Sequence, residues 1–189
     1  MAETISRVIP TDPLFASQWH LYNTGQTSGG VAGFDINVTP VWGDYTGKGV
    51  LIAAIDDGFD ETHPDLSANY RKDLSWDLVF NRAGATPVDA DDDHGTAVSG
   101  LIIGSANNGI GGVGVAWNAQ LIGYRSGLSG NTLAEAALAV PKMLANGVAI
   151  SSNSWGTMDS PFDGQSKQAD VTALTYSLAS QGRGGLGIV

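Results

Sequence analysis

Val50-Leu51-Ile52-Ala53-Ala54-Ile55-Asp56-Asp57-Gly58 joins a run of apolar residues to two carboxylates and a glycine. A short continuous apolar run is typical of a strand that is covered on both faces, as in a parallel sheet. In open α/β sheets, functional groups gather at the carboxyl ends of the strands. We therefore expect a buried strand with Asp56 at its functional end; a lone Asp at such a place is otherwise a turn or helix-cap residue.

Helices and strands alternate along the rest of the chain. Apolar residues recur at helical spacing in residues 94–105, 132–146 and 169–180. Short apolar runs predict further strands at residues 119–124, 148–152 and 187–189, whereas residues 1–48 and 62–93 are predicted to be mostly irregular. This alternation predicts an α/β fold, a parallel sheet with helices on both faces, and the sheet is expected to be incomplete at the carboxyl terminus.

Composition narrows the classes of partner. The 189 residues carry 9 Lys and Arg against 19 Asp and Glu, a net charge of −10, which argues against nucleic acid and anionic membranes because both require clustered cations. There is no Cys, so disulfides and thiolate chemistry are excluded. No apolar run is long enough to span a membrane, and residues 1–4 do not resemble a secretory signal. The excess of carboxylates favours hard cations and basic substrates.

Asp93-His94-Gly95-Thr96 places an imidazole at the start of a predicted helix. Alone, His94 would be interpreted as an exposed turn residue beside a solvated acidic run. A histidine acts as a general base when a carboxylate fixes its tautomer, and a strand-end Asp can face a helix-start His across the edge of a sheet. A glycine follows each motif and permits close backbone approach. We therefore predict that Asp56 and His94 form two thirds of a nucleophilic triad.

Several segments, in this order, resemble the subtilisin-like serine proteases. They are Ile55-Asp56-Asp57-Gly58, His63-Pro64-Asp65-Leu66, His94-Gly95-Thr96-Ala97-Val98-Ser99-Gly100 and Ser154-Trp155-Gly156. The kexin/furin branch is the most similar, because Thr11-Asp12-Pro13-Leu14-Phe15 and Gln18-Trp19-His20-Leu21 resemble its opening. The resemblance implies that residues 1–189 form the amino-terminal portion of a subtilisin-like peptidase catalytic domain. A secreted or extracytoplasmic location is expected.

The resemblance gives Asp56 the role of the triad Asp and His94 that of the general base, in the chain order Asp, His, Ser. The family's nucleophile lies in a Gly-Thr-Ser-x-Ala segment, which this sequence lacks, and the Asn that helps to bind the oxyanion is also missing. We therefore expect a calcium-dependent serine endopeptidase whose serine and oxyanion Asn lie outside this chain. The chain alone is expected to be inactive, with the carboxyl-terminal remainder of the enzyme as its partner. The alternative is a non-catalytic calcium-binding or interaction module on a protease-derived scaffold.

The glycine-rich loop after residue 104 resembles the family's calcium loop. By that match the ligands are two carboxylates, a side-chain amide oxygen and three backbone carbonyls: Asp12, Asp65, Asn108, Ser105, Ile110 and Gly112. All are oxygen donors, which hard cations prefer. An ordinary glycine-rich turn is the alternative. Residues 109–114 also spell Gly-x-Gly-x-x-Gly, but they follow a helix pattern and lead into a strand, whereas a dinucleotide site follows a strand and opens a helix.

Substrate contacts are also implied by the resemblance. Ser154-Trp155-Gly156 matches the segment whose backbone pairs with an extended peptide or protein substrate as an added strand; the alternative for Trp155 is core packing. Asp57 and Asp91 match positions that face the substrate residue second from the cut, where two carboxylates would prefer Lys or Arg. The alternative for Asp91 is a place in a solvated acidic run, residues 91–93.

Overall fold

The computed structural model describes residues 6–128, 132–156, 179–182 and 187–189. Contacts between residues divide the chain into two compact units. The first unit consists of residues 1–49, 62–69 and 99–119, and the second of residues 50–61, 70–98 and 120–189. The predicted Asp–His pair therefore belongs to the second unit, and the predicted calcium ligands all belong to the first.

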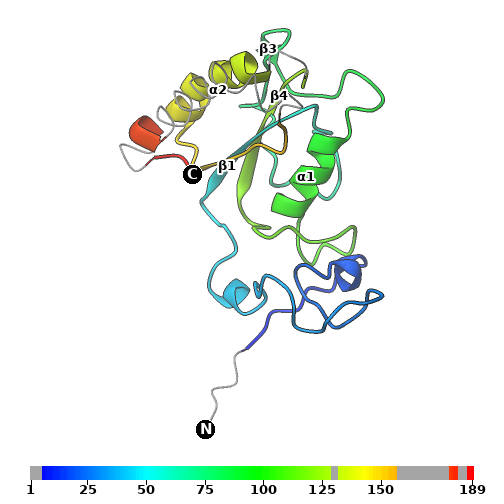
Figure 1. Cartoon of the computed structure of the whole chain (residues 1–189). Coiled ribbons are helices and arrows are strands. Elements are labelled where there is room, and N and C mark those ends of the chain that lie inside the picture. The colour runs from blue at the N-terminus through cyan, green and yellow to red at the C-terminus, as the bar shows by residue number, and fades with distance from the viewer. Residues whose placement is uncertain (1–5, 129–131, 157–178, 183–186) are drawn as a thin grey trace, which may run out of the picture. The chain divides into compact units, whose positions relative to one another are not determined.

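The second unit is built on a five-stranded sheet with the strand order β3-β2-β4-β1-β5 (Figure 1). The central strands, β1 (Leu51–Asp56) and β4 (Gln120–Arg125), are parallel; β5 (Ile150–Ser152) pairs in parallel with β1, and β2 (Trp76–Asp77) with β4. The short strand β3 (Arg82–Ala83) is antiparallel to β2. Because the longer strands are parallel, their carboxyl ends meet at one edge of the sheet, which is where α/β proteins place functional groups.

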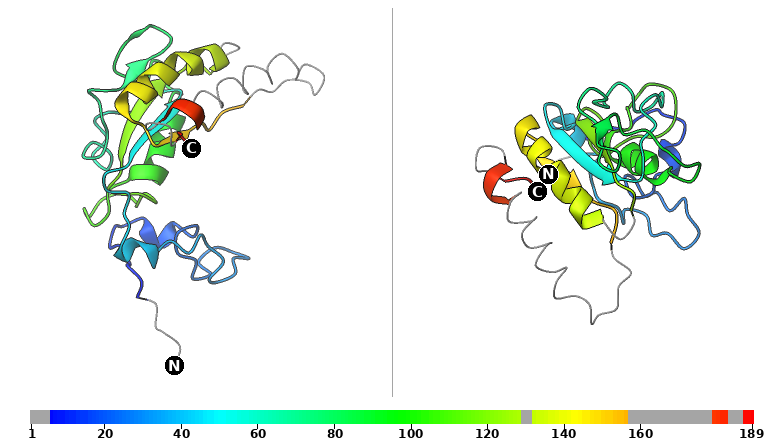
Figure 2. Two further views of the ribbon diagram at one scale, coloured as in Figure 1. Left: turned by 90° about the vertical axis from the view of Figure 1, so that its left-hand side faces the viewer. Right: turned by 90° about the horizontal axis from the view of Figure 1, so that it is seen from above.

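Helices cover both faces of this sheet, as Figure 2 shows: α2 (Thr132–Asn146) lies on one face, and α1 (His94–Ile103) begins on the other. The inner side of α2 carries Ala136, Ala139 and Met143, all fully buried, in one core with Ile55 and Tyr124 of the sheet. Two small side chains let the helix lie close to the strands, and the flexible Met fills the remaining space. The predicted α/β fold with helices on both faces of the sheet is confirmed, and among the described strands the sheet departs from the predicted parallel arrangement only at β3.

The structure adds strands where the sequence predicts an irregular segment. β2 and β3 lie within residues 62–93, and at two residues each they are too short to produce an alternating pattern. Residues 187–189, predicted as a strand, form none in the structure, but Val189 pairs with the segment of β5: Ser151 N donates to Val189 O at 2.8 Å, and Val189 N donates to Ala149 O at 3.1 Å. Most of the predicted helix at residues 169–180 lies outside the described residues.

The first unit has little regular structure, as predicted, apart from η1 (Phe15–Ser17), η2 (Val41–Gly43) and the second half of α1. An aromatic core stabilises it, with the rings of Trp42 and Trp117 at 4.3 Å. Trp42 Nε1 donates to Val115 O at 2.9 Å, so its buried polar atom is satisfied. In the part of the chain that the structure describes, no helix is both long and apolar enough to cross a membrane.

Candidate functional site

The Asp–His pair lies at the edge of the sheet where the parallel strands end. Asp56 is the last residue of β1 and is 1% exposed, whereas His94 is the first residue of α1 and half of its side chain is exposed. Asp56 Oδ1 and His94 Nδ1 are 2.8 Å apart. The two motifs thus meet at one edge of the sheet, as the sequence predicts. Because Asp56 occupies Nδ1, the other ring nitrogen, Nε2, is left for a reacting group.

The electrostatics of the pair suit an orienting carboxylate and a base. The hydrogen bond to Asp56, and then the charge of that carboxylate, raises the pKa of His94, while burial lowers it. Burial raises the pKa of Asp56, and hydrogen bonds from His94 and from the Asp57 backbone oppose that rise. The Asp57 N–H donates to Asp56 Oδ1 at 2.9 Å. A proton taken up by His94 is therefore stabilised by the neighbouring carboxylate.

This pairing predicts how the His94 ring titrates. An NMR pH titration of the 189-residue chain is expected to show a His94 midpoint above 6.5, because the Asp56 carboxylate favours the protonated ring. Asp56→Asn should lower the midpoint, since the amide keeps the shape of the side chain and removes its charge. Asp93→Asn, which removes a neighbouring exposed charge, is the matched control and should have a smaller effect. Equal shifts in the two variants would contradict the pairing.

Asp57 has a structural role that the sequence does not predict. Its Oδ1 accepts a hydrogen bond from Gly95 N at 2.8 Å, and its Oδ2 accepts one from His94 N at 3.2 Å. The carboxylate therefore caps the amino terminus of α1, where free N–H groups and the helix dipole favour a negative charge. Helix caps are normally recognised from adjacent residues, and this cap comes from the end of a strand, so the local sequence gives no signal for it.

Gly95 allows the start of α1 to approach the end of β1. A Cβ atom at this position would overlap Gly58 O and lie 2.9 Å from Asp56 Cβ. The glycine of the His-Gly-Thr motif is thus required by packing next to the Asp–His pair. Thr96, the next residue, accepts a hydrogen bond at Oγ1 from Asp60 N at 2.9 Å, which adds a second link between the helix start and the segment after β1.

Gly95→Ala is expected to destabilise the chain by about 1–3 kcal/mol, because the added methyl group overfills a close contact between backbones. Gly100→Ala in the same helix is the matched control, since a Cβ atom there meets nothing within 4 Å. It should stabilise the chain by about 0.5–1 kcal/mol through the better helix propensity of Ala. Urea unfolding followed by circular dichroism measures both, and an equal effect of the two substitutions would contradict this packing.

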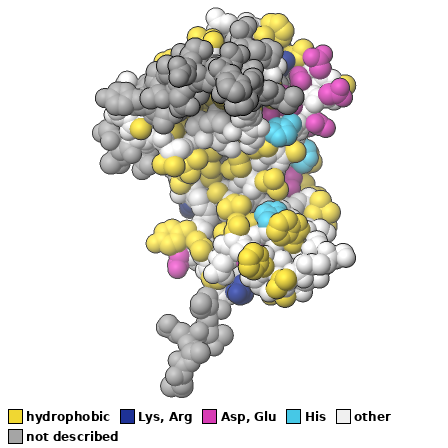
Figure 3. Space-filling model, in the orientation of Figure 1, with side chains coloured by type: hydrophobic (Ala, Val, Ile, Leu, Met, Phe, Trp, Pro, Cys, Tyr) yellow, Lys and Arg dark blue, Asp and Glu magenta, His cyan; other side chains and the backbone are white. Residues whose placement is uncertain are grey.

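The acidic segment before α1 is exposed except at Asp92, and its members differ in their contacts. Asp91 is exposed, which fits both of its predicted roles. Asp92 is partly buried, and its Oδ2 accepts hydrogen bonds from Val88 N at 2.9 Å and Asp89 N at 3.1 Å. Figure 3 shows acidic side chains gathered close to histidine at one side of this unit. A cationic group that approached His94 would therefore meet a field of negative charge.

Ser154, Trp155 and Gly156 follow β5 at the same edge of the sheet as the end of β1, because Ala54 and Ser152 are in register on parallel strands. Ser154 and Gly156 are exposed, whereas Trp155 is partly buried and packs against the core of the second unit. The core-packing alternative for Trp155 is therefore present in the structure. The residues on either side of it are open to solvent.

In the first unit, Asp12 and Asp65 both reach the glycine-rich loop that follows α1. Asp12 is 4% exposed, and its carboxylate accepts hydrogen bonds from the backbone N–H groups of residues 107–109 at 2.6, 3.0 and 3.3 Å. Asp65 is 6% exposed; its Oδ1 accepts from Asn108 Nδ2 at 2.7 Å and its Oδ2 from Gly112 N at 3.2 Å. The predicted side-chain ligands are thus brought together at this loop.

Two features of the loop fit a cation. Among the described residues, neither buried carboxylate forms an ion pair with a Lys, Arg or His side chain. The backbone carbonyls of Ser105, Ile110 and Gly112 accept no hydrogen bond from any described residue, whereas those of Gly111 and Val113 do. Buried carboxylates without a counter-charge are costly, and the three carbonyls are free of donors from the described part of the chain. Carboxylate and carbonyl oxygens are the donor set that calcium prefers.

Gln18 supports this loop in a way that the sequence does not predict. Its Nε2 donates to Val113 O at 2.9 Å, and its Oε1 accepts from Val113 N at 2.8 Å. Gly111 has a φ of +56°, and a Cβ atom there would overlap Asp65 Oδ2, so this position requires glycine. The amino-terminal segment therefore fixes the shape of a loop that lies 95 residues away in the sequence.

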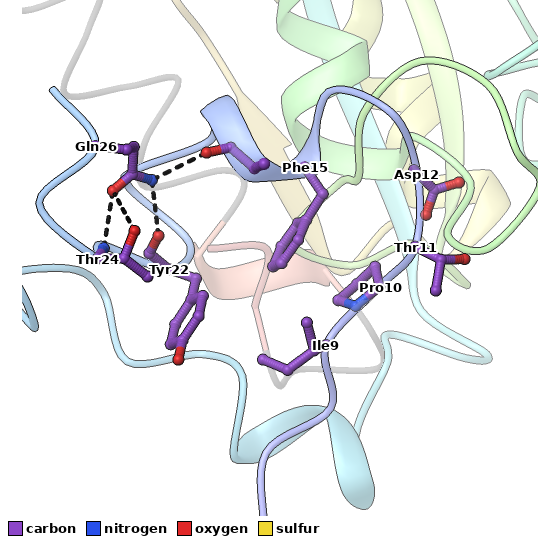
Figure 4. A pocket seen from close by; sticks show the side chains of 9 residues that line it. Ile9, Pro10, Thr11, Asp12, Phe15, Tyr22, Thr24 and Gln26 are labelled. Carbon is purple, nitrogen blue, oxygen red and sulfur yellow. Dashed lines mark hydrogen bonds between the residues drawn. The ribbon is translucent and has the colours of Figure 1, made fainter.

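A cavity of about 290 Å³ lies in the same unit, beside the segment that carries Asp12 (Figure 4). Gln26 spans one side, where its Nε2 donates to Ala16 O at 3.2 Å and to Tyr22 O at 2.9 Å. Phe15 and Ile9 give the cavity a mostly apolar lining. Asp12 is the one predicted site residue among those that line it, so this hollow is not the predicted peptide site.

The chain is similar to known proteins over most of its length. Residues 47–188 match the subtilase family. A PC3-like endoprotease (variant B) of Hydra vulgaris is 43% identical over 189 aligned residues, which cover 96% of this chain and 26% of the relative. Neuroendocrine convertase 2 of Rattus norvegicus is 48% identical over 118 residues, covering 60% of this chain and 18% of the relative. The chain thus spans about a quarter or less of the length of these curated relatives.

Solved structures agree with the sequence relatives. The serine protease of Aeromonas sobria, crystallised with its chaperone, superposes with a TM-score of 0.77 at 31% identity, covering 94% of this chain and 31% of that one. The same protease in a second structure gives a TM-score of 0.74 at 32% identity, covering 95% and 32%. Fold and relatives thus lead to the same conclusion as the motifs: the chain belongs to the subtilase family, in its kexin/furin-like branch.

Proposed function

We propose that this chain supplies the Asp–His half of the catalytic triad of a serine endopeptidase. The observation that carries the proposal is the 2.8 Å contact between buried Asp56 and half-exposed His94 at the carboxyl-end edge of the sheet. A nucleophilic triad needs a base held in one tautomer by a carboxylate, with its second nitrogen open to the nucleophile. In this proposal residues 1–189 are the amino-terminal portion of the catalytic domain, and the protein acts outside the cytoplasm.

The proposed reaction is acyl transfer. A serine hydroxyl from outside this chain attacks the peptide carbonyl, and His94 Nε2 accepts the serine proton. Asp56 stabilises the resulting imidazolium through Nδ1–H, and His94 then returns the proton to the leaving amine. Hydrolysis of the acyl-enzyme repeats the sequence with water as the nucleophile. The serine and the oxyanion Asn are proposed to belong to the carboxyl-terminal remainder of the enzyme.

For the substrate, we propose an extended peptide that pairs as an added strand with the backbone of two exposed residues, Ser154 and Gly156. Asp57 and Asp91 would face the residue second from the cut. Each Asp57 oxygen already accepts one backbone hydrogen bond, and a carboxylate oxygen has a second lone-pair site, so the capping role leaves the charge available to a basic side chain. A preference for Lys or Arg at that substrate position is the expected result.

Calcium is proposed as the resident ion of the first unit. Asp12, Asp65 and Asn108 would hold it with their side-chain oxygens, and Ser105, Ile110 and Gly112 with their backbone carbonyls. The ion would supply positive charge for two buried carboxylates and would take no part in peptide cleavage. In the proposal Asn108 turns its amide oxygen toward the ion, since its nitrogen now faces Asp65.

The test is to join this chain to a carboxyl-terminal segment that carries the Gly-Thr-Ser-x-Ala motif and the oxyanion Asn, here called the reassembled enzyme. Cleavage is measured with a peptide library that varies the residue second from the cut. Cleavage that requires calcium and favours a basic residue there supports the proposal. A folded reassembled enzyme that cleaves no member of the library contradicts it and favours a non-catalytic calcium-binding or interaction module.

A further inference from the structure

Among the described residues, Arg125 is the one Lys or Arg that is buried. It ends β4, where it is in register with Asp56 of β1 on one side and with Asp77 of β2 on the other. Residues in register on neighbouring parallel strands point to the same face of a sheet. A row of alternating charge, negative, positive and negative, therefore crosses the carboxyl ends of these strands next to His94. The proposed peptide hydrolysis assigns no role to this arginine.

The Arg125 guanidinium joins two carboxylates. Its Nη1 lies 3.5 Å from Asp77 Oδ1, and its Nη2 lies 3.4 Å from Asp92 Oδ2. Asp77 has a second cationic partner in Arg82, whose Nε lies 3.5 Å from Asp77 Oδ2. Both arginines also lie over the ring of Phe80, at 5.6 and 5.0 Å. Of the two arginines, Arg125 contacts Asp92, whereas no contact with Asp92 is seen for Arg82. Arg82 is therefore a matched control for Arg125.

Asp92 links Arg125 to the segment that leads to His94, because it lies two residues before the histidine. Its Oδ2 closes a turn over residues 88–92 through the N–H groups of Val88 and Asp89. Desolvation raises the pKa of Asp92, but these backbone hydrogen bonds and the charge of Arg125 outweigh it, so the pKa is lowered. Residues 86–91 are all exposed and give the turn no buried apolar side chain. Next to the turn, Pro87 packs closely against Gly58.

We propose that Arg125 is a positioning residue for His94: by holding Asp92, it fixes the turn that leads into α1 and so sets the ring of His94 against Asp56. The effect of Arg125 on catalysis rests on the proposed function, because the proposal adds Arg125 to the same site. Arg125 acts through Asp92 and does not contact the ring. Loss of either partner lets the turn move, and the start of α1 then loses one of its restraints beside the strand.

The first experiment observes His94 in the 189-residue chain by NMR. The wild-type chain is expected to give an Nδ1–H signal, because Asp56 lies 2.8 Å from that nitrogen. Arg125→Met is expected to abolish this signal and to shift the titration midpoint of His94 toward that of a free histidine. Arg82→Met, which removes a cation from the same Asp77 and Phe80, should leave both unchanged. The same loss in Arg82→Met would overturn the proposal, because removal of any cation near Asp77 would then suffice.

Arg125→Met leaves Asp77 and Asp92 without their shared partner and so can prevent folding. A second variant covers that case. Asp92→Asn cuts the charge contact with Arg125, while its amide oxygen still accepts from the turn N–H groups and Arg125 still pairs with Asp77. We expect Asp92→Asn to reproduce the loss of the His94 signal. A folded Asp92→Asn chain with a wild-type His94 signal and titration midpoint would overturn the proposal.

Kinetics of the reassembled enzyme separate this inference from the proposed function. Asp92→Asn is expected to lower kcat by about 10- to 100-fold, because small misplacements of a reacting group are costly. KM should change by less than about threefold, and Arg82→Met should leave both constants near wild type. If the wild-type enzyme cleaves and Asp92→Asn matches its kcat, the positioning role is wrong and the protease stands. If the wild type is inactive while the NMR result holds, the protease is wrong and the positioning stands.

Discussion

Replacing His94 by alanine in the reassembled enzyme is expected to lower kcat for peptide cleavage by about 10⁴- to 10⁶-fold. Without the ring, nothing accepts the serine proton as the hydroxyl attacks, and nothing returns it to the leaving amine. Asp56 then stays buried without the side chain that, among the described residues, forms an ion pair with it. Steady-state kinetics on one fluorogenic peptide, with stability checked by circular dichroism, measure the loss.

The control for this variant is Asp93→Asn, one residue earlier in the sequence. Asp93 is exposed, and its charge has the smallest effect of the groups that raise the pKa of His94, so its removal should change kcat by less than about threefold. Asp56→Asn should fall between the two, with a loss of about 10⁴-fold, because the ring remains but loses its tautomer and its orientation. Near-wild-type turnover in His94→Ala would show that another group acts as the base.

The Asp56–His94 pair could be predicted because each residue follows a local rule. One ends an apolar strand and the other starts a helix, and a parallel sheet brings such ends to a common edge. The calcium loop needed more than local rules: its turns are visible as Asn and Gly, but Asp12 lies about 95 residues earlier in the chain. The family resemblance supplied that long-range pairing, and composition alone could not have done so.

The contacts of residues 91–93 show where sequence reasoning stops. As a sequence they are three equivalent carboxylates, and a solvated acidic run is the simplest interpretation. In the structure Asp91 and Asp93 are exposed, whereas Asp92 turns inward to Arg125. This difference depends on β2, β4 and β1 being neighbours in that order, which no local pattern encodes. The capping of α1 by Asp57 is hidden for the same reason.

Calcium is expected to raise the melting temperature of the 189-residue chain by about 10 °C relative to the same protein in excess chelator. A ligand at a thousand times its dissociation constant stabilises a folded protein by about 4 kcal/mol, and a chain of this size gains roughly 2–4 °C per kcal/mol. The physical reason is that Asp12 and Asp65 are buried, and within the described residues neither carboxylate forms an ion pair with a cationic side chain. Thermal melting with calcium, magnesium or chelator measures the effect, and magnesium should give little of it because it prefers a smaller octahedral site.

Asp12→Asn should remove most of the calcium-dependent shift. The variant also weakens the hydrogen bonds to residues 107–109, so its melting temperature falls in both conditions, and the difference between calcium and chelator is the quantity that reports the site. Asp44→Asn is the matched control, because it removes one charge from an exposed position of the same unit and should keep the full shift. A wild-type chain that melts at the same temperature with calcium and with chelator has no such site. An Asp12→Asn chain that keeps the wild-type shift binds calcium elsewhere, because a cation held by the loop must lose most of its affinity when one of two carboxylates becomes neutral.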